Sequence, residues 1–379
     1  MRLLYCSRDY TAHDLRFLRA FVAAGFETHY LRLESDGVPY VRDPLPGGAS
    51  WVAWAGGGPP RPIPDAVEAY LPNFASTVDR IKPDVMHAGP VQSFGLMAAL
   101  VRTVPFVLVS WGSDILVEAK RDAWYTWATR TAVRACAAFV CDSTAVLADA
   151  RELAGGELAP HLCVPWGLDV VPERSNPQRR HAIRRELGWD DAIIVVATRS
   201  WHHGYRVPEL VDVFATASAK VPRLRLALLG AGEEAPAVHT RIRAHRLEDR
   251  VIVPGMLPGT ELRRLLSAAD IYLSLVPSDG TSISLLEAMA HGLSVVVTLN
   301  AGNAQWVEDG RSGYLVPAAD LAAWSERLVA LATDRGAARR MAMAGREHTL
   351  AHANWSRNVP RLIALYRRSA SRSVTVSSR

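Results

Sequence analysis

The chain has 379 residues, of which 49% are hydrophobic and 21% are charged, and its formal net charge at pH 7 is +5. This length is too great for one ordinary hydrophobic core and predicts two domains. Because the charge is mild and arginines are dispersed among acidic residues, the composition argues against nucleic-acid recognition. It favours a small anionic substrate or contact with an acidic membrane surface.

The sequence gives little indication of a targeting segment or of a metal site. No run of about 18 apolar residues could span a bilayer, and the opening stretch MRLLYCSRDY lacks the features of a signal peptide. We therefore expect a cytoplasmic protein. The cysteines lack metal-binding spacing and predict reduced, structural thiols; they are Cys6, Cys136, Cys141 and Cys163.

The first half alternates short apolar strands with helices. It opens with LLYC, a helix that Thr11 to Asp14 can cap, and THYLRL. This β-α-β opening has no Gly-x-Gly-x-x-Gly fingerprint, so we expect no dinucleotide in the first domain. Residues 43–65, rich in glycine and proline, form a long excursion, either a mobile loop or a lid, and a helix is predicted over residues 66–81.

Two later strands of this half end in polar or aromatic residues. PDVMHAGP ends at His87 and Gly89, and PFVLVSWGSDIL ends at Trp111, Gly112 and Asp114. The carboxyl edge of a parallel sheet is where α/β proteins bind ligands. We therefore expect these strand ends to border a ligand site.

The helix predicted over residues 120–138 places Trp124 and Trp127 on one face. Two interpretations remain open: a basic, aromatic helix on a membrane surface, or an ordinary helix that buries its tryptophans. The polar segment 170–191 is interpreted as an interdomain linker. Its arginines are most simply interpreted as lying on a solvent-exposed face; they are Arg179, Arg180, Arg184 and Arg185.

The second half opens with the strand AIIVVATRS and continues with LRLALLGAGEEAP, which mimics a dinucleotide fingerprint at Gly230 and Gly232. Glu233 and Glu234 would stand at the helix start beside the supposed pyrophosphate. Acids there would repel it, so an oxidoreductase is disfavoured.

The most informative stretch is PSDGTSISLLEAMAHG, residues 277–292. It predicts a loop after a strand, a helix over Ile283–Ala290 that Thr281 or Ser282 caps, and a stop at Gly292. The first amides of this helix can hold a diphosphate, which approaches closely because Gly280 has no side chain. Asp279 and Glu287 would flank that phosphate. A strand, a loop and a helix are nevertheless common to every doubly wound sheet.

This stretch resembles the carboxylate motif of retaining nucleotide-sugar glycosyltransferases with the GT-B fold. The resemblance implies two Rossmann-like domains facing a central cleft, with a last helix that crosses back to the first domain. The boundaries expected are an acceptor domain at residues 1–169, the linker at 170–191, a nucleotide-sugar domain at 192–349 and the crossover helix with a disordered tail at 350–379.

The resemblance also implies roles for individual residues. Asp279, where the family commonly has glutamate, would contact the transferred sugar, and Glu287 the ribose. Arg199 would hold the diphosphate, with Arg206 in place of the usual lysine, because alignment puts Tyr205 at the lysine position. Further binding residues are Gly280, Thr281, Ser282, Ile283, Leu257, Trp111, Asp114 and His13. The family often has histidine where Trp111 stands.

The predicted function is metal-independent sugar transfer, with retention, from a nucleotide diphosphate sugar to an acceptor hydroxyl or amine. No cofactor and no metal are expected, and contact with the inner face of a membrane stays open. The alternatives are a nucleotide-sugar-binding protein without turnover and a GT-B epimerase or phosphorylase.

Overall fold

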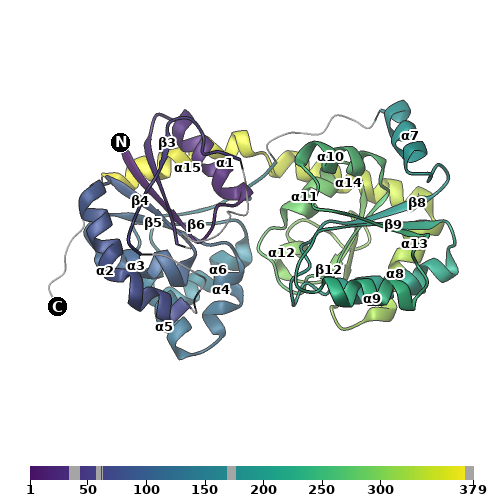
Figure 1. The fold of residues 1–379 in the computed structure, drawn as a ribbon, viewed down its shortest axis with the longest axis horizontal. Helices are drawn as coiled ribbons and strands as arrows, with labels where there is room; N and C mark the ends of the chain where they lie inside the picture. Colours follow the sequence, from purple (N-terminus) through teal and green to yellow (C-terminus); the bar gives the residue numbers. More distant parts are fainter. Residues whose placement is uncertain (34–42, 57–60, 62, 169–175, 372–379) are drawn as a thin grey trace. The chain divides into compact units, whose positions relative to one another are not determined.

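The computed structural model describes residues 1–33, 43–56, 61, 63–168 and 176–371. Parts of the predicted excursion and linker and the tail from residue 372 lie outside these ranges. The chain folds into two compact units, Met1–Trp166 with Trp355–Arg379, and Gly167–Asn354. Each is a parallel sheet with helices on both faces (Figure 1), as predicted for the GT-B fold.

The sheet of the first unit has the strand order β3-β2-β1-β4-β5-β6-β7. Its strands are β1 (Arg2–Ser7), β2 (Glu27–Arg32), β3 (Ala49–Trp51), β4 (Val85–Ala88), β5 (Phe106–Val109), β6 (Ala138–Cys141) and β7 (His161–Cys163). Its helices are α1 (Ala12–Ala23), α2 (Ile63–Ile81), α3 (Leu96–Val101), α4 (Ser113–Leu116), α5 (Ala123–Ala135), α6 (Thr144–Ala154) and α15 (Trp355–Ala370).

The last helix, α15, lies with α1 on one face of this sheet (Figure 1), so the chain returns to its first unit. Tyr366 on α15 approaches β4, where its hydroxyl lies 2.6 Å from Nδ1 of the buried His87. The predicted return of the chain is confirmed. The predicted excursion contributes an edge strand, β3, that sequence reasoning did not foresee.

Helix α5 buries a different face from the predicted one. Its core side chains are Tyr125, Ala128, Thr129, Ala132 and Val133. Trp127 is 49% exposed. The interpretation of an ordinary helix that buries both tryptophans is therefore wrong for Trp127.

The sheet of the second unit has the order β10-β9-β8-β11-β12-β13. Its strands are β8 (Ile193–Ala197), β9 (Leu224–Leu229), β10 (Val251–Gly255), β11 (Ile271–Ser274), β12 (Ser294–Thr298) and β13 (Tyr314–Val316). Its helices are α7 (Pro177–Glu186), α8 (Val207–Lys220), α9 (Ala235–Ala244), α10 (Gly259–Ala268), α11 (Ile283–Ala290), α12 (Ala301–Ala304), α13 (Leu321–Thr333) and α14 (Arg335–His352).

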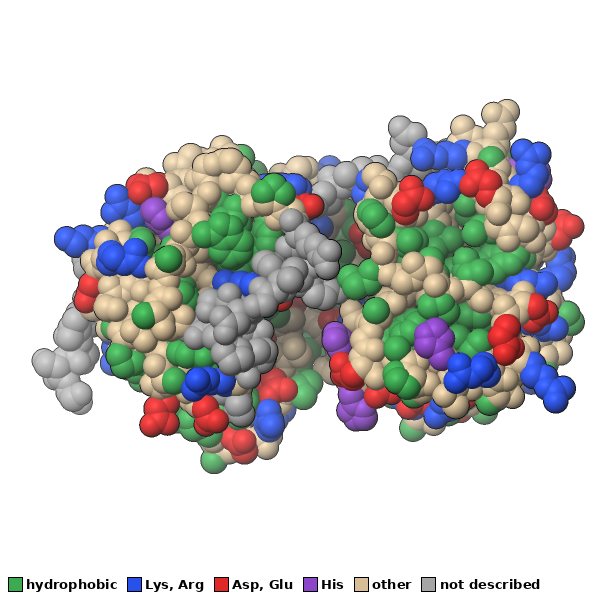
Figure 2. All heavy atoms as spheres, in the orientation of Figure 1, with side chains coloured by type: hydrophobic (Ala, Val, Ile, Leu, Met, Phe, Trp, Pro, Cys, Tyr) green, Lys and Arg blue, Asp and Glu red, His purple; other side chains and the backbone are tan. Residues whose placement is uncertain are grey.

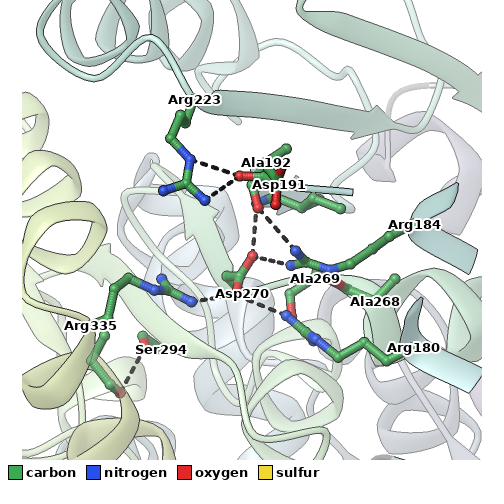
Figure 3. A network of polar contacts seen from close by, with 12 residues as sticks. Arg180, Arg184, Asp191, Ala192, Arg223, Ala268, Ala269, Asp270, Ser294 and Arg335 are labelled. Carbon is green, nitrogen blue, oxygen red and sulfur yellow. Dashed lines mark hydrogen bonds and ion pairs between the residues drawn. The ribbon is translucent and has the colours of Figure 1, made fainter. Parts of the chain in front are cut away.

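The arginines of α7 do not form the solvated face that the sequence predicts. Arg180 and Arg184 both pair with the buried carboxylate of Asp270, which precedes β11 (Figure 3). Arg335, at the start of α14, binds the same carboxylate. Two helices of the second unit, α7 and α14, are thus tied to one acid, and α7 is part of this unit.

Charged side chains are mixed on the surface. On the face of each unit that Figure 2 shows, lysine and arginine side chains alternate with acidic ones and form no single basic patch. Such a distribution is unlike the concentrated basic surface of a nucleic-acid-binding protein.

Candidate functional site

Helix α11 begins and ends where the sequence predicts. Ser282 is its N-cap, and its hydroxyl accepts a hydrogen bond from the Leu285 amide at 3.4 Å. Gly292 follows the helix with a φ of 77°, a left-handed conformation that glycine adopts readily. Within the described ranges, the amides of Ile283 and Ser284 have no acceptor. The first turn therefore offers two donors and the positive end of the helix dipole to an anion.

An ion pair lies beside this first turn. Strands β8 and β11 are neighbours in the sheet, so the loops that follow them leave at the same edge. Arg199 lies on the first loop and Asp279 on the second, and Arg199 Nη2 is 3.0 Å from Asp279 Oδ2. Their side chains are 17% and 21% exposed, so the pair is mostly shielded from water.

Other contacts orient the Arg199 guanidinium. Its Nη1 donates to the Ser282 hydroxyl at 3.1 Å, and its centre lies 4.8 Å from the centroid of the Tyr205 ring. Burial lowers the pKa of Arg199, but the attraction of Asp279 and of nearby tyrosine hydroxyls outweighs this effect and raises the pKa overall. Arg199 is thus a permanent cation at the helix start.

The structure places Tyr205, and not Arg206, against Arg199. Arg206 donates to the main-chain oxygen of Ala318 and lies 3.4 Å from Glu209. These contacts hold it toward α8 and the segment before α13. Its predicted role in place of a lysine would require it to leave both partners.

The two histidines of the same loop pair with acids. His202 Nδ1 lies 2.9 Å from Glu233, and the His203 amide donates to Glu233 at 2.9 Å. The His203 amide and the His202 side chain together lower the pKa of Glu233 to about 2. The glycine loop after β9 therefore presents a carboxylate where a dinucleotide phosphate would need open amides.

A glycine on α12 packs directly on the Asp279 loop. A Cβ atom on Gly302 would lie 2.1 Å from the carbonyl oxygen of Gly280 and 2.3 Å from that of Asp279. The Trp306 indole also donates to the Thr281 hydroxyl at 3.4 Å. The segment after β12 therefore packs closely on the Asp279 loop.

The remaining predicted residues of the second unit lie at its sheet edge or on α11. Glu287 lies in the second turn of α11 and is partly exposed. Leu257 follows β10 and is partly exposed, packed on an apolar cluster. Together with Arg199, Asp279 and the first turn of α11, these positions put the predicted donor residues of the second unit on loops and on a helix that follow β8, β10 and β11.

In the first unit, Asp114 stabilises the loop after β5. Its carboxylate accepts hydrogen bonds from the amides of Val91, Trp111 and Ile115 at 3.2, 3.3 and 3.0 Å and from the Ser110 hydroxyl. Burial raises the pKa of Asp114, and these hydrogen bonds oppose the rise. The side chain thus joins the loops after β4 and β5.

Trp111 and His13 lie together in an aromatic group. Their ring centroids are 5.5 Å apart, and Trp111 also packs on Phe17 and Trp166 at 6.0 and 5.7 Å. Trp111 remains partly exposed. The structure thus shows a packing role for Trp111.

Two segments of the chain match family models. Residues 191–334 match "Glycosyl transferases group 1", and residues 68–143 match "Glycosyl transferase 4-like". These two segments are thus similar in sequence to glycosyltransferases, and the chain has the GT-B fold. The match in the second unit covers the Arg199 loop, the Asp279 loop and α11.

Solved structures of GT-B glycosyltransferases share the fold over almost the whole chain. Sucrose-phosphate synthase from Thermosynechococcus elongatus has a TM-score of 0.79 at 18% identity, covering 97% of this chain and 98% of that one. Anabaena HepE in complex with UDP-glucose has a TM-score of 0.76 at 17% identity, covering 96% and 99%.

Curated relatives match over shorter stretches. A putative colanic acid biosynthesis glycosyltransferase of Escherichia coli is 39% identical over 112 residues, which is 28% of this chain and 28% of that protein. The sulfoquinovosyl transferase of Arabidopsis thaliana is 27% identical over 301 residues, 74% of this chain and 56% of that protein. The chain therefore matches less than two thirds of the length of either relative.

In the part of the chain that the structure describes, no three His, Cys, Asp or Glu side chains are grouped as a metal ion would require. No described helix has the length and apolar character needed to cross a bilayer.

Sequence reasoning missed two features of this site. It did not foresee that Gly302 would touch the Asp279 loop or that Ser282 would both cap α11 and accept from Arg199. The role of Ser282 could have been predicted, because this serine stands at a predicted N-cap next to a predicted anion site. For Gly302 the sequence offered only its position after a predicted strand.

Proposed function

We propose that the chain transfers a sugar from a nucleotide diphosphate sugar to an acceptor hydroxyl or amine, with retention of configuration and without a metal ion. The observation that carries this proposal is the ion pair of Arg199 and Asp279 at the first turn of α11. A shielded arginine beside free helix amides suits a diphosphate.

In this proposal each part of the nucleotide sugar contacts different residues of the second unit. The diphosphate binds Arg199 and the amides of Ile283 and Ser284, and it approaches closely over Gly280. Glu287, on α11, accepts from the ribose hydroxyls. Asp279 faces the transferred sugar, and the main chain around Leu257 meets the base.

Arg199 is the principal cation of the proposed leaving-group site, because Arg206 is engaged with Ala318 and Glu209. As the bond to the sugar breaks, negative charge grows on the departing diphosphate. A fixed cation and helix amides stabilise that charge without reorganisation, which is the role a metal ion has elsewhere. The anomeric carbon then gains oxocarbenium character. The acceptor attacks from the face that the diphosphate leaves and gives its proton to an oxygen of the departing diphosphate.

The first choice of donor follows from the structural neighbours. Anabaena HepE was solved with UDP-glucose, and the pneumococcal O-GlcNAc transferase GtfA with UDP and GlcNAc. These complexes support a UDP-sugar as the first donor to test. The exposed Trp127, near the exposed Arg130 on α5, supports a further proposal of contact with an acidic membrane surface.

The test is the heat of binding of UDP, GDP and ADP, measured with and without a chelator. We expect one diphosphate to bind equally well in both conditions. Glu287→Ala should weaken it by about tenfold or more, and Glu326→Ala, an exposed control on α13, should not. If no diphosphate binds, or if Glu287→Ala binds as the wild type does, the donor site is wrong.

Retention and turnover need a second measurement. With the identified donor and an accepted acceptor, the coupling constant of the anomeric proton in the product reports its configuration. An inverted product contradicts retention. Binding without product from any acceptor class tested would favour the alternative of a binding protein without turnover, for which the packed Trp111 is the supporting observation.

A further inference from the structure

A cavity of about 370 Å³ lies in the first unit, at the carboxyl ends of three neighbouring strands. Arg8 follows β1, Gln92 and Ser93 follow β4, and Ser113 follows β5. Its volume falls in the range that holds small ligands. Since it is built from one unit only, its shape does not depend on the other unit.

Three arginines line this cavity: Arg8, Arg61 and Arg121. Aromatic rings position two of them. The Arg121 guanidinium lies 4.9 Å from the centroid of the Tyr125 ring and donates to the Tyr125 hydroxyl at 3.2 Å. Arg61 lies 5.7 Å from the Tyr70 ring. An arginine side chain that already stacks on an aromatic ring loses less conformational freedom on binding an anion than an unrestrained one does.

The two acids that line the cavity offset this charge only in part. Glu118 lies 3.4 Å from Arg121, where both side chains are open to solvent. Asp114 is 4% exposed, and both of its oxygens already accept hydrogen bonds from the protein. Among the described residues that line the cavity, three are thus cations and two are acids, one of which is turned into the fold.

Charges of both signs lie around the Tyr125 hydroxyl. Burial raises its pKa, Arg121 and Arg8 act against that rise, and Glu118 and Asp122 add to it. Arg8 follows β1 and Arg121 precedes α5, so the fold brings both residues to this cavity.

Neutral groups in the cavity suit a polyol. Gln92 is 4% exposed, and its amide nitrogen donates to the Asp114 carbonyl oxygen at 2.6 Å and to Thr129 at 2.8 Å. Because both amide hydrogens are used, the Gln92 carbonyl oxygen is the group left for a ligand hydroxyl. Ser93 and Ser113 add further hydroxyls.

We propose that this cavity binds the acceptor and that the acceptor is a small anionic polyol, whose phosphate or carboxylate meets Arg8, Arg61 and Arg121. The inference rests on the proposed transferase function, in which the first unit supplies the acceptor. Charged guanidinium groups recognise such oxyanions through paired hydrogen bonds.

The test uses inorganic phosphate, glucose 6-phosphate, glucuronate and uncharged glucose as probes in calorimetric titrations of the full chain. We expect at least one anion to bind and glucose not to. Arg8→Gln and Arg121→Gln should each weaken the anion by about tenfold. Arg130→Gln, an exposed control on α5, should bind as the wild type does. Comparing glucose 6-phosphate with glucuronate distinguishes a phosphate from a carboxylate source.

Titration of the same variants with UDP separates the two hypotheses. If UDP binds and none of the anions does, or if Arg8→Gln and Arg121→Gln leave anion affinity unchanged, the acceptor inference is wrong and the donor site stands. If the anions bind as expected and no nucleoside diphosphate does, the cavity is an anion site and the transferase proposal fails.

Discussion

Arg199 and Asp279 pair at 3.0 Å across two loops that leave neighbouring strands, so the cation of the proposed donor site has an anionic partner within the chain. A bound diphosphate must share or displace that partner. The two residues should therefore respond differently to substitution.

Arg199→Ala should weaken diphosphate binding by about tenfold or more, because a charge-assisted contact is lost. Asp279→Asn should bind diphosphate at least as well as the wild type, because the competing carboxylate is gone, yet turn over at least about tenfold more slowly. Calorimetry and product formation measure the two effects. Arg185→Ala, exposed on α7, is the control. Weaker diphosphate binding by Asp279→Asn would show that the Asp279 carboxylate does not compete with the diphosphate for Arg199.

Gly302→Ala should disrupt the donor site from outside it. The new methyl group would overlap the carbonyl oxygens of Gly280 and Asp279, which belong to the backbone and cannot rotate away. We expect a loss of about 1–3 kcal/mol in stability and weaker diphosphate binding. Gly156→Ala is the matched control, because a Cβ there meets nothing within 4 Å. Thermal unfolding and calorimetry provide the readouts, and equal behaviour of both variants would refute the close packing.

Asp270→Ala should destabilise the second unit. It would leave Arg180, Arg184 and Arg335 gathered without their shared carboxylate (Figure 3). Breaking a buried ion network by removing one side costs about 3–5 kcal/mol. Urea unfolding measures this, with the exposed Asp249→Asn as control. A loss no greater than that of the control would mean that the network contributes little.

His87 should make the stability of the first unit depend on pH. Its ring is buried, stacks on Tyr5 at a centroid distance of 3.8 Å, and burial lowers the pKa of His87 from 6.5 to about 3. Below pH 6.5 the His87 imidazole binds a proton in the unfolded chain but stays neutral in the folded chain. Stability is therefore full above that pH and falls by up to about 1.4 kcal/mol per pH unit as the pH drops toward the folded pKa.

Urea unfolding at about pH 7 and about pH 5 would measure this slope. His87→Gln should lose the part of the slope that comes from this residue, whereas His203→Gln, with a side chain that is 91% exposed, should keep it. An unchanged slope in His87→Gln would show that another group causes it.

Local features were predictable from the sequence. The bounds of α11, a cap at Thr281 or Ser282 and a stop at Gly292 follow from neighbouring residues alone, since a cap and the amides it satisfies lie within one turn. The structure selects Ser282 as the cap. The alternation of strands and helices, and so the class of fold, follows from the same short-range periodicity.

The sequence by itself thus determined the class of fold, the helix of the central motif and the loop residues that could meet a diphosphate. Only the tertiary structure decided which of them meet. It paired Arg199 with Asp279 and Tyr205 while engaging Arg206 elsewhere, and it turned Arg180 and Arg184 from expected surface charges into partners of Asp270. The physical reason is that a cation has no preferred partner along the chain. Its partner is whichever acid the packing of distant strands and helices brings within reach.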